Sequence, residues 1–188
     1  MSLEQIRESL PDYARDIRLN LGSVLTPQGA PGLTEKQIAS IALATAIASR
    51  NVELARAVED WSRGQLDETS VAAARAAAAI MGMNNVYYRF VHLVDDEEYA
   101  TMPARLRMNV IGNPGIDRLD FELLSLAVSA VNGCGMCIVA HEKQLRKHEV
   151  SREAIQSAVR IAATLHAVAG VLEHSAAAEA PAVTAVAA

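Results

Sequence analysis

Aromatic residues make up only 4% of this sequence, although 51% of its 188 residues are hydrophobic. Much of that hydrophobic content is alanine, in runs such as residues 72–74 and 76–79. Alanine is the strongest helix former, and its small side chain lets helices approach closely. A β-sheet depends more on branched and aromatic residues on its faces. The composition therefore predicts an all-α protein, and the length fits one compact multi-helix domain.

The sequence also lacks a basic excess and a long apolar run. Its net charge is −5, which leaves no basic face to neutralise a nucleic-acid backbone. Arginine or polar residues interrupt each apolar stretch before the roughly 20 residues that a membrane span requires. Glu4 lies where a secretory signal would need positive charge. We therefore expect neither nucleic acid nor a membrane as a partner, and a cytoplasmic location.

Only two cysteines are present, three residues apart, so the disulfide framework of small secreted domains is excluded. Cys134 directly follows Asn132-Gly133, a pair that tolerates the left-handed conformation at the end of a helix. Cys134 should then begin a new helix, where free N–H groups and the helix dipole stabilise its thiolate. The two cysteines are therefore expected to act at one local site.

Helical spacing places Cys134, Cys137 and His141 on one face of the new helix. A C-x-x-C pair on a first turn can close a disulfide with little backbone movement. An imidazole one turn further on can accept or return the thiol proton. The two cysteines and His141 are the minimum set of groups for reversible dithiol chemistry. Glu122 lies on the preceding helix, which should pack antiparallel across so short a turn, so its position suits a proton relay. Taken alone, Glu122 is interpreted as a surface residue.

Local signals divide the remaining chain into helices. Thr34 and Gln37 form a capping-box pattern, Asn84-Asn85 is expected to interrupt an alanine-rich helix, and Ser151 should cap the last one. The same order of helices appears twice, which suggests an internal duplication. The domain should span residues 1–174 and a mobile alanine-rich tail residues 175–188. Helices are predicted at residues 2–21 with a break at Pro11, 34–49, 51–61, 67–83, 87–94, 119–131, 134–147 and 152–173, with a solvated loop at 95–98.

Other interpretations of the cysteines stay open. Buried cysteines often serve as small hydrophobic residues. Cys134, Cys137, His141 and His148 could instead form a zinc site, although zinc usually draws ligand pairs from separate elements. A non-enzymatic, zinc-stabilised interaction module would follow from that. We interpret the remaining histidines as structural residues. A thioredoxin-like fold is disfavoured because no strand pattern flanks the two cysteines.

The stretch from Phe121-Glu122-Leu123-Leu124 through Asn132-Gly133-Cys134-Gly135-Met136-Cys137 to Ala140-His141-Glu142 resembles alkyl hydroperoxide reductase D, of the carboxymuconolactone decarboxylase-like superfamily. The likeness extends to residues 10–17, 81–89, 106–110 and 113–115, and covers nearly all of the chain except the tail. It implies an all-helical homotrimer that reduces a partner peroxiredoxin. It also implies weak alkyl hydroperoxidase activity, no bound cofactor, and electrons from dihydrolipoamide on the lipoyl-bearing acyltransferase of a 2-oxoacid dehydrogenase.

The resemblance also implies roles by position. Cys137 is similar to the cysteine that attacks peroxide and passes through a sulfenic acid. Cys134 matches an exposed partner that resolves it as a disulfide and can form a mixed disulfide with the peroxiredoxin. His141 matches the base and Glu122 the rest of the proton relay. Many members carry histidine where this chain has Met136, so that residue's role is not carried over. A decarboxylase of the same superfamily is the alternative enzyme, but that chemistry does not need C-x-x-C.

Overall fold

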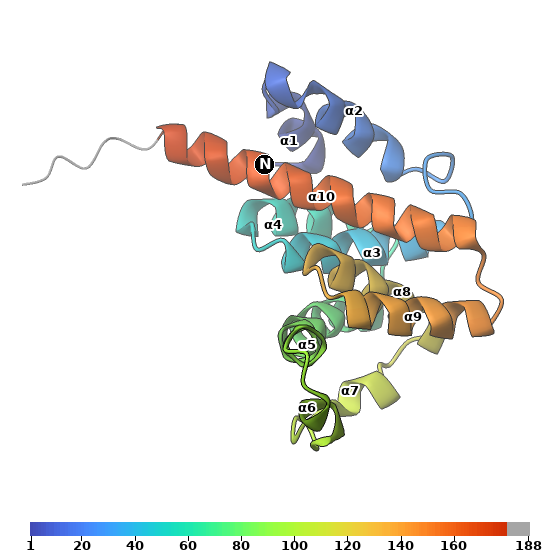
Figure 1. Cartoon of the computed structure of the whole chain (residues 1–188). Coiled ribbons are helices and arrows are strands. Elements are labelled where there is room, and N and C mark those ends of the chain that lie inside the picture. Colours follow the sequence, from blue (N-terminus) through green and yellow to red (C-terminus); the bar gives the residue numbers. More distant parts are fainter. Residues whose placement is uncertain (180–188) are drawn as a thin grey trace, which may run out of the picture.

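Ten α-helices and one short 3-10 helix make up the regular structure of residues 1–179, the part of the chain that this computed structural model describes (Figure 1). No β-strand occurs among those residues, which confirms the predicted all-α class. The elements are α1 (Leu3–Ser9), η1 (Asp12–Ala14), α2 (Arg15–Val24), α3 (Glu35–Ala48), α4 (Val52–Ser62), α5 (Glu68–Leu93), α6 (Glu97–Thr101), α7 (Asn109–Gly112), α8 (Arg118–Val131), α9 (Gly135–Lys147) and α10 (Arg152–Glu179).

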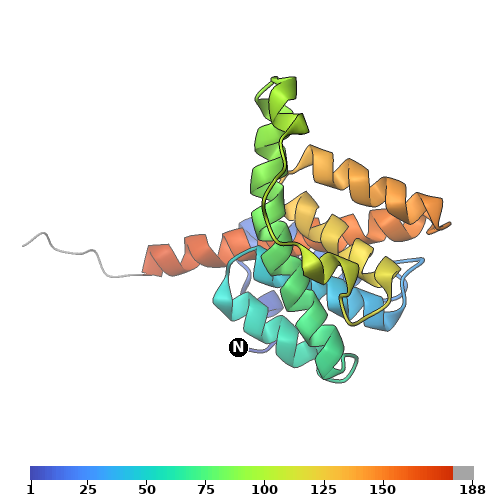
Figure 2. The same ribbon diagram turned by 90° about the horizontal axis from the view of Figure 1, so that it is seen from below.

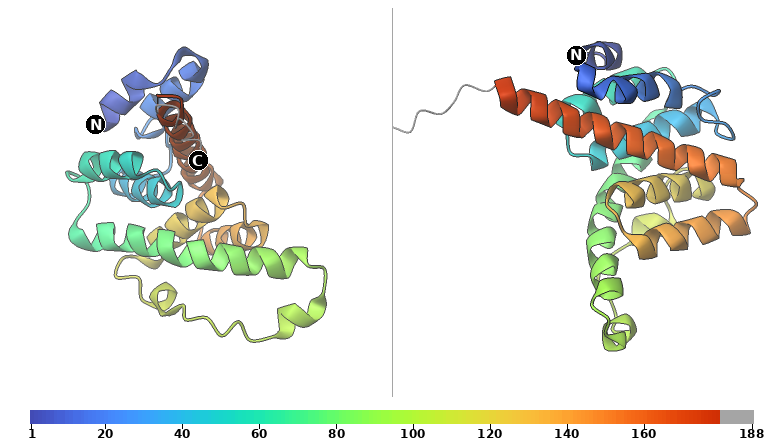
Figure 3. Two further views of the ribbon diagram at one scale, coloured as in Figure 1. Left: turned by 90° about the vertical axis from the view of Figure 1, so that its left-hand side faces the viewer. Right: turned by 45° about the horizontal axis from the view of Figure 1, so that its top comes forward.

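Helix α3 lies at the centre of the core, and every residue from Ile38 to Ala46 on it is buried. It packs against α4, α5, α8 and α10, so its small side chains face neighbours on all sides (Figures 1 and 3). The predicted capping box is confirmed: the Gln37 amide N–H donates to Thr34 Oγ1, and the Thr34 N–H donates to Gln37 Oε1. This local signal fixes where the central helix begins.

Helices α8 and α9 form the antiparallel hairpin that the cysteine motif predicts. Asn132 caps the end of α8, and Gly133 takes the left-handed conformation with φ 68°. A side chain at that φ would be strained, so glycine suits the turn. Cys134 is then the N-cap of α9. The short turn brings the start of α9 back against the end of α8.

Helix α5 differs from its prediction in one respect. It runs without a break from Glu68 to Leu93, so the interruption expected at Asn84-Asn85 is wrong. Asparagine favours helix ends because its amide competes with the backbone for hydrogen bonds. Here Asn85 is fully buried and its amide bonds to side chains of α8 and its cap, so the backbone competition does not arise.

The C-terminal half of α5 extends beyond the other helices. The segment that follows, with α6 and α7, runs back alongside it (Figures 2 and 3). A solvated loop was expected at 95–98, but α6 already begins at Glu97, with the Asp96 side chain accepting from the Glu98 N–H at 3.0 Å. The α6–α7 segment returns the chain towards the body. It thereby covers one side of the cysteine hairpin.

Helix α10 is longer than predicted and continues to Glu179. Residues 175–179 of the expected tail are therefore helical, and residues 180–188 of it lie outside the described part of the chain. The segment Arg152–Ser175 is long and apolar enough to cross a membrane by composition alone, but 56% of its apolar 18-residue window is buried inside the fold. It packs against α2, α3 and α8, as a core helix does. The internal duplication stays a prediction.

Candidate active site

The two cysteine sulfurs are in direct contact at the start of α9. Cys134 Sγ and Cys137 Sγ are 2.6 Å apart, and both residues are free thiols rather than a disulfide. The Cys137 N–H also donates to Cys134 Sγ at 3.4 Å, as expected when a cysteine occupies the N-cap. A disulfide bond is about 2.05 Å long, so the pair needs only a small approach to close one.

The exposure of the two thiols is the reverse of what the resemblance implied. Cys134 was expected to be the exposed partner, but it is 0% exposed. Cys137 is 6% exposed and lines a cavity, so it is the sulfur that a small molecule reaches first. At the N-cap of α9 the Cys134 side chain lies against Cys137, and the packing of neighbouring helices around this turn buries it.

Burial, together with the neighbouring Cys134 thiol, raises the pKa of Cys137 from 9.0 to about 11. A carboxamide contact from Asn85 opposes the rise only in part. The thiol of Cys137 is therefore protonated near neutral pH. Nucleophilic use of this sulfur requires a base that takes its proton.

A candidate for that base, His141, lies one turn along α9. His141 lines the same cavity as Cys137. On its other side, His141 Nδ1 lies 2.7 Å from Glu122 Oε2 of α8. The two side chains are 14% and 21% exposed, so water screens this contact only in part. The carboxylate fixes the imidazole ring and favours a proton on Nδ1, which leaves Nε2 free to exchange a proton.

A second polar cluster, which sequence analysis missed, supports the turn that carries the cysteines. Asn85 Nδ2 donates to Ser129 Oγ, and Asn132 Nδ2 donates to Asn85 Oδ1, both at 2.9 Å. Arg89 donates to the Asn132 carbonyl at 2.6 Å, and the Cys134 N–H donates to the Ser129 carbonyl. The cluster holds α5, the end of α8 and the cysteine turn in one arrangement. The Asn84-Asn85 pair between Met83 and Val86 was the only sequence signal for it.

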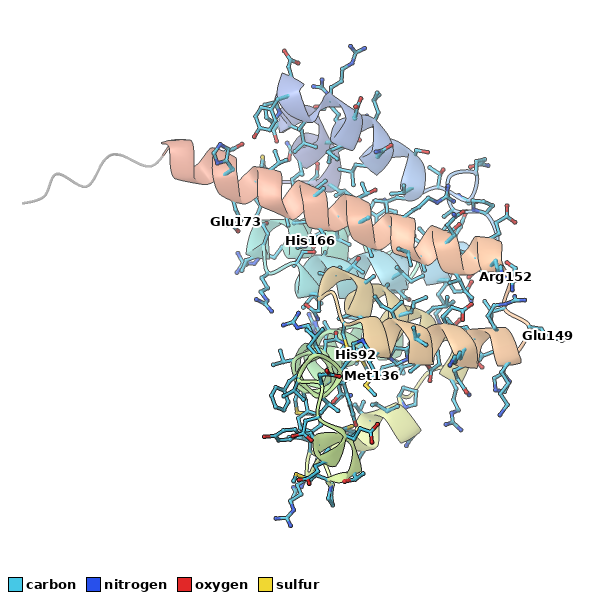
Figure 4. All side chains as sticks on the ribbon, in the orientation of Figure 1. His92, Met136, Glu149, Arg152, His166 and Glu173 are labelled. Atoms are coloured by element: carbon cyan, nitrogen blue, oxygen red, sulfur yellow. The ribbon has the colours of Figure 1, made fainter. Side chains whose placement is uncertain are left out.

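The cavity beside Cys137 has a volume of about 270 Å³ and lies between α5, α7 and α9. Figure 4 shows Met136 where the start of α9 approaches α5. The exposed histidines His92 and His166, also labelled there, do not line this cavity. Its lining consists of Met81, Asn84, Tyr88, Met108, Ile111, Met136, Cys137, Ala140 and His141.

The four residues of the alternative zinc site do not all lie close together. His148 is the C-cap of α9, at the opposite end from the cysteines, and its Nε2 lies 3.3 Å from Gln144 Nε2. Across residues 1–179 no group of three or more His, Cys, Asp or Glu side chains is placed to hold a metal ion.

Known proteins of one family resemble this chain over most of its length. The profile of the carboxymuconolactone decarboxylase family matches residues 97–180, which include the cysteine hairpin. Relatives named alkyl hydroperoxide reductase AhpD, from Gluconacetobacter diazotrophicus and Rhodopseudomonas palustris, are each 55% identical over 177 residues. These matches cover 94% of this chain and 96% of each relative. The chain belongs to the AhpD family. A third relative of that name, from Rhodospirillum centenum, is 56% identical and 94% covered.

Membership in the AhpD family confirms the resemblance stated from the motif residues. The cysteine pair, His141 and Glu122 lie together in the fold. The family match covers both the hairpin and α7, which lines one side of the cavity. The part of the chain that carries the candidate chemistry is therefore the part that the family profile recognises.

Proposed function

We propose that this chain is an antioxidant thiol-disulfide oxidoreductase that reduces organic hydroperoxides with Cys137 and Cys134. The contact between the two sulfurs, with His141 and Glu122 beside them, is the observation that carries the proposal. The names of the AhpD relatives support the same activity. A location in the cytoplasm, where thiols are kept reduced, fits this chemistry.

In the proposed reaction, His141 takes the proton of the Cys137 thiol, and Glu122 stabilises the resulting imidazolium. The Cys137 sulfur attacks the terminal oxygen of the hydroperoxide, so that an S–O bond forms and the O–O bond breaks. The leaving alkoxide takes the proton from His141 and departs as an alcohol. Cys137 is left as a sulfenic acid. Each proton that His141 accepts is thus returned within one cycle.

Cys134 then resolves the sulfenic acid. Its sulfur attacks the sulfur of Cys137, an S–S bond forms, and the hydroxyl leaves as water with the Cys134 proton. A dihydrolipoyl group of a lipoyl-bearing acyltransferase returns two electrons and two protons through a mixed disulfide. Because Cys134 is buried, a mixed disulfide between Cys134 and a partner peroxiredoxin requires the start of α9 to open.

We further propose that the chain forms a homotrimer. Large apolar side chains are exposed along the projecting half of α5 and on α6, including Phe90, Leu93 and Tyr99. Exposed apolar residues continue onto α9 at Met136 and Val139, next to the cysteines. Apolar patches of this kind are typical of protein interfaces. Copies of the same chain would cover this surface and exclude water from the cysteine hairpin.

A coupled assay tests the function. Dihydrolipoamide, regenerated by its dehydrogenase and NADH, should support reduction of tert-butyl hydroperoxide by the wild-type chain. The variant with both cysteines replaced by serine should lose this activity, because no other cysteine is present. Full retention would refute the proposal. Decarboxylation of a lactone substrate that survives in the same variant would instead favour the decarboxylase chemistry of the superfamily.

A further inference from the structure

One polar group in the cavity beside Cys137 has no partner. Asn84 is 4% exposed and lines the cavity, and its Oδ1 makes no hydrogen bond within the described part of the chain. A buried acceptor without a donor typically costs about 1–3 kcal/mol. Such atoms are rare in native proteins, and a functional role, an ion or a bound water is the usual explanation for one.

The contrast with the next residue is informative. Asn85 is also buried on α5, but both ends of its amide are bonded to neighbouring side chains. Asn85 therefore has a structural explanation and Asn84 does not. Because Oδ1 is an acceptor, the missing partner must be an O–H or N–H donor.

The rest of the cavity wall is mainly apolar. Three methionine side chains and an isoleucine surround the space, and the polar groups that join them are Asn84, Cys137, His141 and the Tyr88 hydroxyl. The Tyr88 hydroxyl is already directed at Met108 Sδ, 3.9 Å away. A fitting ligand is therefore a compact apolar molecule with one hydrogen-bond donor next to the sulfur. The volume of about 270 Å³ lies just below the usual range for small-molecule sites, about 300–1,000 Å³, which favours a short or branched organic group.

We propose that Asn84 anchors the hydroperoxide substrate, with the peroxide O–H donating to Asn84 Oδ1 and the organic group against Met81, Met108 and Met136. This inference rests on the function proposed above and adds the residue that orients the substrate. The anchored O–H belongs to the terminal oxygen, which is the atom that Cys137 attacks. The apolar methionine side chains predict a preference for organic hydroperoxides over hydrogen peroxide, which has no apolar part to bury.

The anchored hydrogen stays on the terminal oxygen throughout the attack. The S–O bond forms and the O–O bond breaks, but the O–H bond persists in the sulfenic acid. Asn84 therefore binds the ground state and the transition state about equally, and its loss should raise KM more than it lowers kcat.

Asn84→Leu is the variant that tests the anchor, because leucine fills a similar volume and removes the unpartnered acceptor. We expect kcat/KM for tert-butyl hydroperoxide to fall by about tenfold, mainly through KM, the effect of one lost hydrogen bond. The rate at which methyl methanethiosulfonate modifies Cys137 should stay within about twofold of wild type, since that reagent has no donor for Asn84 to bind. Resistance to urea should be equal or greater, because a buried unsatisfied group is removed.

Ser70→Ala is the matched control. Ser70 Oγ is the other buried side-chain atom without a partner in the described residues, and it lies on the same helix away from the cavity. Its removal should have a similar effect on stability and none on peroxide reduction. If Asn84→Leu does not fold, Asn84→Ala with the same measurements replaces it.

Three results would overturn the anchor. The first is a kcat/KM for tert-butyl hydroperoxide within twofold of wild type in the Asn84 variant. The second is a fall in the methyl methanethiosulfonate rate as large as the fall with peroxide, which would assign the effect to the thiol. The third is an equal loss in Ser70→Ala. A wild-type chain without any peroxide reduction would refute the proposed function itself, and so the two failures are distinguishable.

Discussion

His141 Nδ1 lies 2.7 Å from Glu122 Oε2, and this contact joins the two arms of the α8–α9 hairpin one turn beyond Cys137. The sequence separation of these residues is 19, so the contact depends on the antiparallel packing of the hairpin. It places a carboxylate on the side of the imidazole away from the cavity that His141 shares with Cys137. The imidazole can accept a proton from the cavity side only while the ring keeps this orientation.

Replacing Glu122 by glutamine tests the orientation. The amide keeps the size of the side chain but no longer stabilises the imidazolium, so peroxide reduction should fall by about 10–100-fold. Glu142→Gln is the control, because Glu142 is adjacent to His141 but makes no ion pair within the described residues. Steady-state rates with tert-butyl hydroperoxide would measure both. Equal rates in the two variants would remove Glu122 from the relay.

The pH dependence of Cys137 modification follows from its raised pKa. Below a pKa of about 11 the thiolate fraction grows about tenfold per pH unit, so labelling by methyl methanethiosulfonate should keep rising beyond pH 10. In denatured chain the labelling should level off near pH 9. The same difference has a stability consequence: the fold favours the neutral thiol, so this contribution is complete below pH 9 and is lost as pH rises towards 11. Peptide mapping after timed labelling would resolve Cys137 from Cys134, and a plateau of native labelling near pH 9 would contradict the assignment.

The cluster around Asn85 predicts a large loss of stability. Asn85→Ala leaves the Ser129 hydroxyl and the Asn132 amide without their bonds in a buried environment. The free energy of unfolding should fall by about 3 kcal/mol, measured by urea denaturation. Asn113→Ala, at an exposed loop position, should change it by less than about 0.5 kcal/mol. Equal effects in the two variants would show that the buried network contributes little.

The projecting part of α5 makes a prediction about assembly. Leu93 is 69% exposed, and Leu93→Lys should weaken a homotrimer that buries this side chain. Tyr13→Lys changes an equally exposed residue of η1, at 69%, and should leave assembly unchanged. Sedimentation equilibrium of both variants and wild type measures the mass directly. A monomeric wild type, or a trimer untouched by Leu93→Lys, would contradict the proposed surface.

The parts of the fold that sequence analysis predicted are those with local causes. Thr34 and Gln37 cap α3 through bonds three residues apart, and Gly133 ends α8 through its own φ. The contact of Cys137 with Cys134 likewise follows from helical spacing. These features need no knowledge of the rest of the chain.

Features with distant causes were missed. The helix through Asn85 is continuous because partners 44 and 47 residues away satisfy its amide. The burial of Cys134 and the cavity beside Cys137 depend on how α5 and α7 pack against α9, and no local pattern indicates that packing. Asn84 looked like part of a helix break for the same reason. The candidate chemistry could thus be predicted from the motif, whereas the substrate cavity could not.

The most direct test of the central claim is the intact mass of the reduced chain after one equivalent of tert-butyl hydroperoxide. The wild type should lose two hydrogen atoms and both free thiols, and dihydrolipoamide should restore them. In Cys134→Ser the mass should rise by one oxygen atom, as a sulfenic acid that dimedone traps on Cys137, and Cys137→Ser should not react. Oxidation of Cys134 alone, or a wild type that keeps both thiols, would contradict the account.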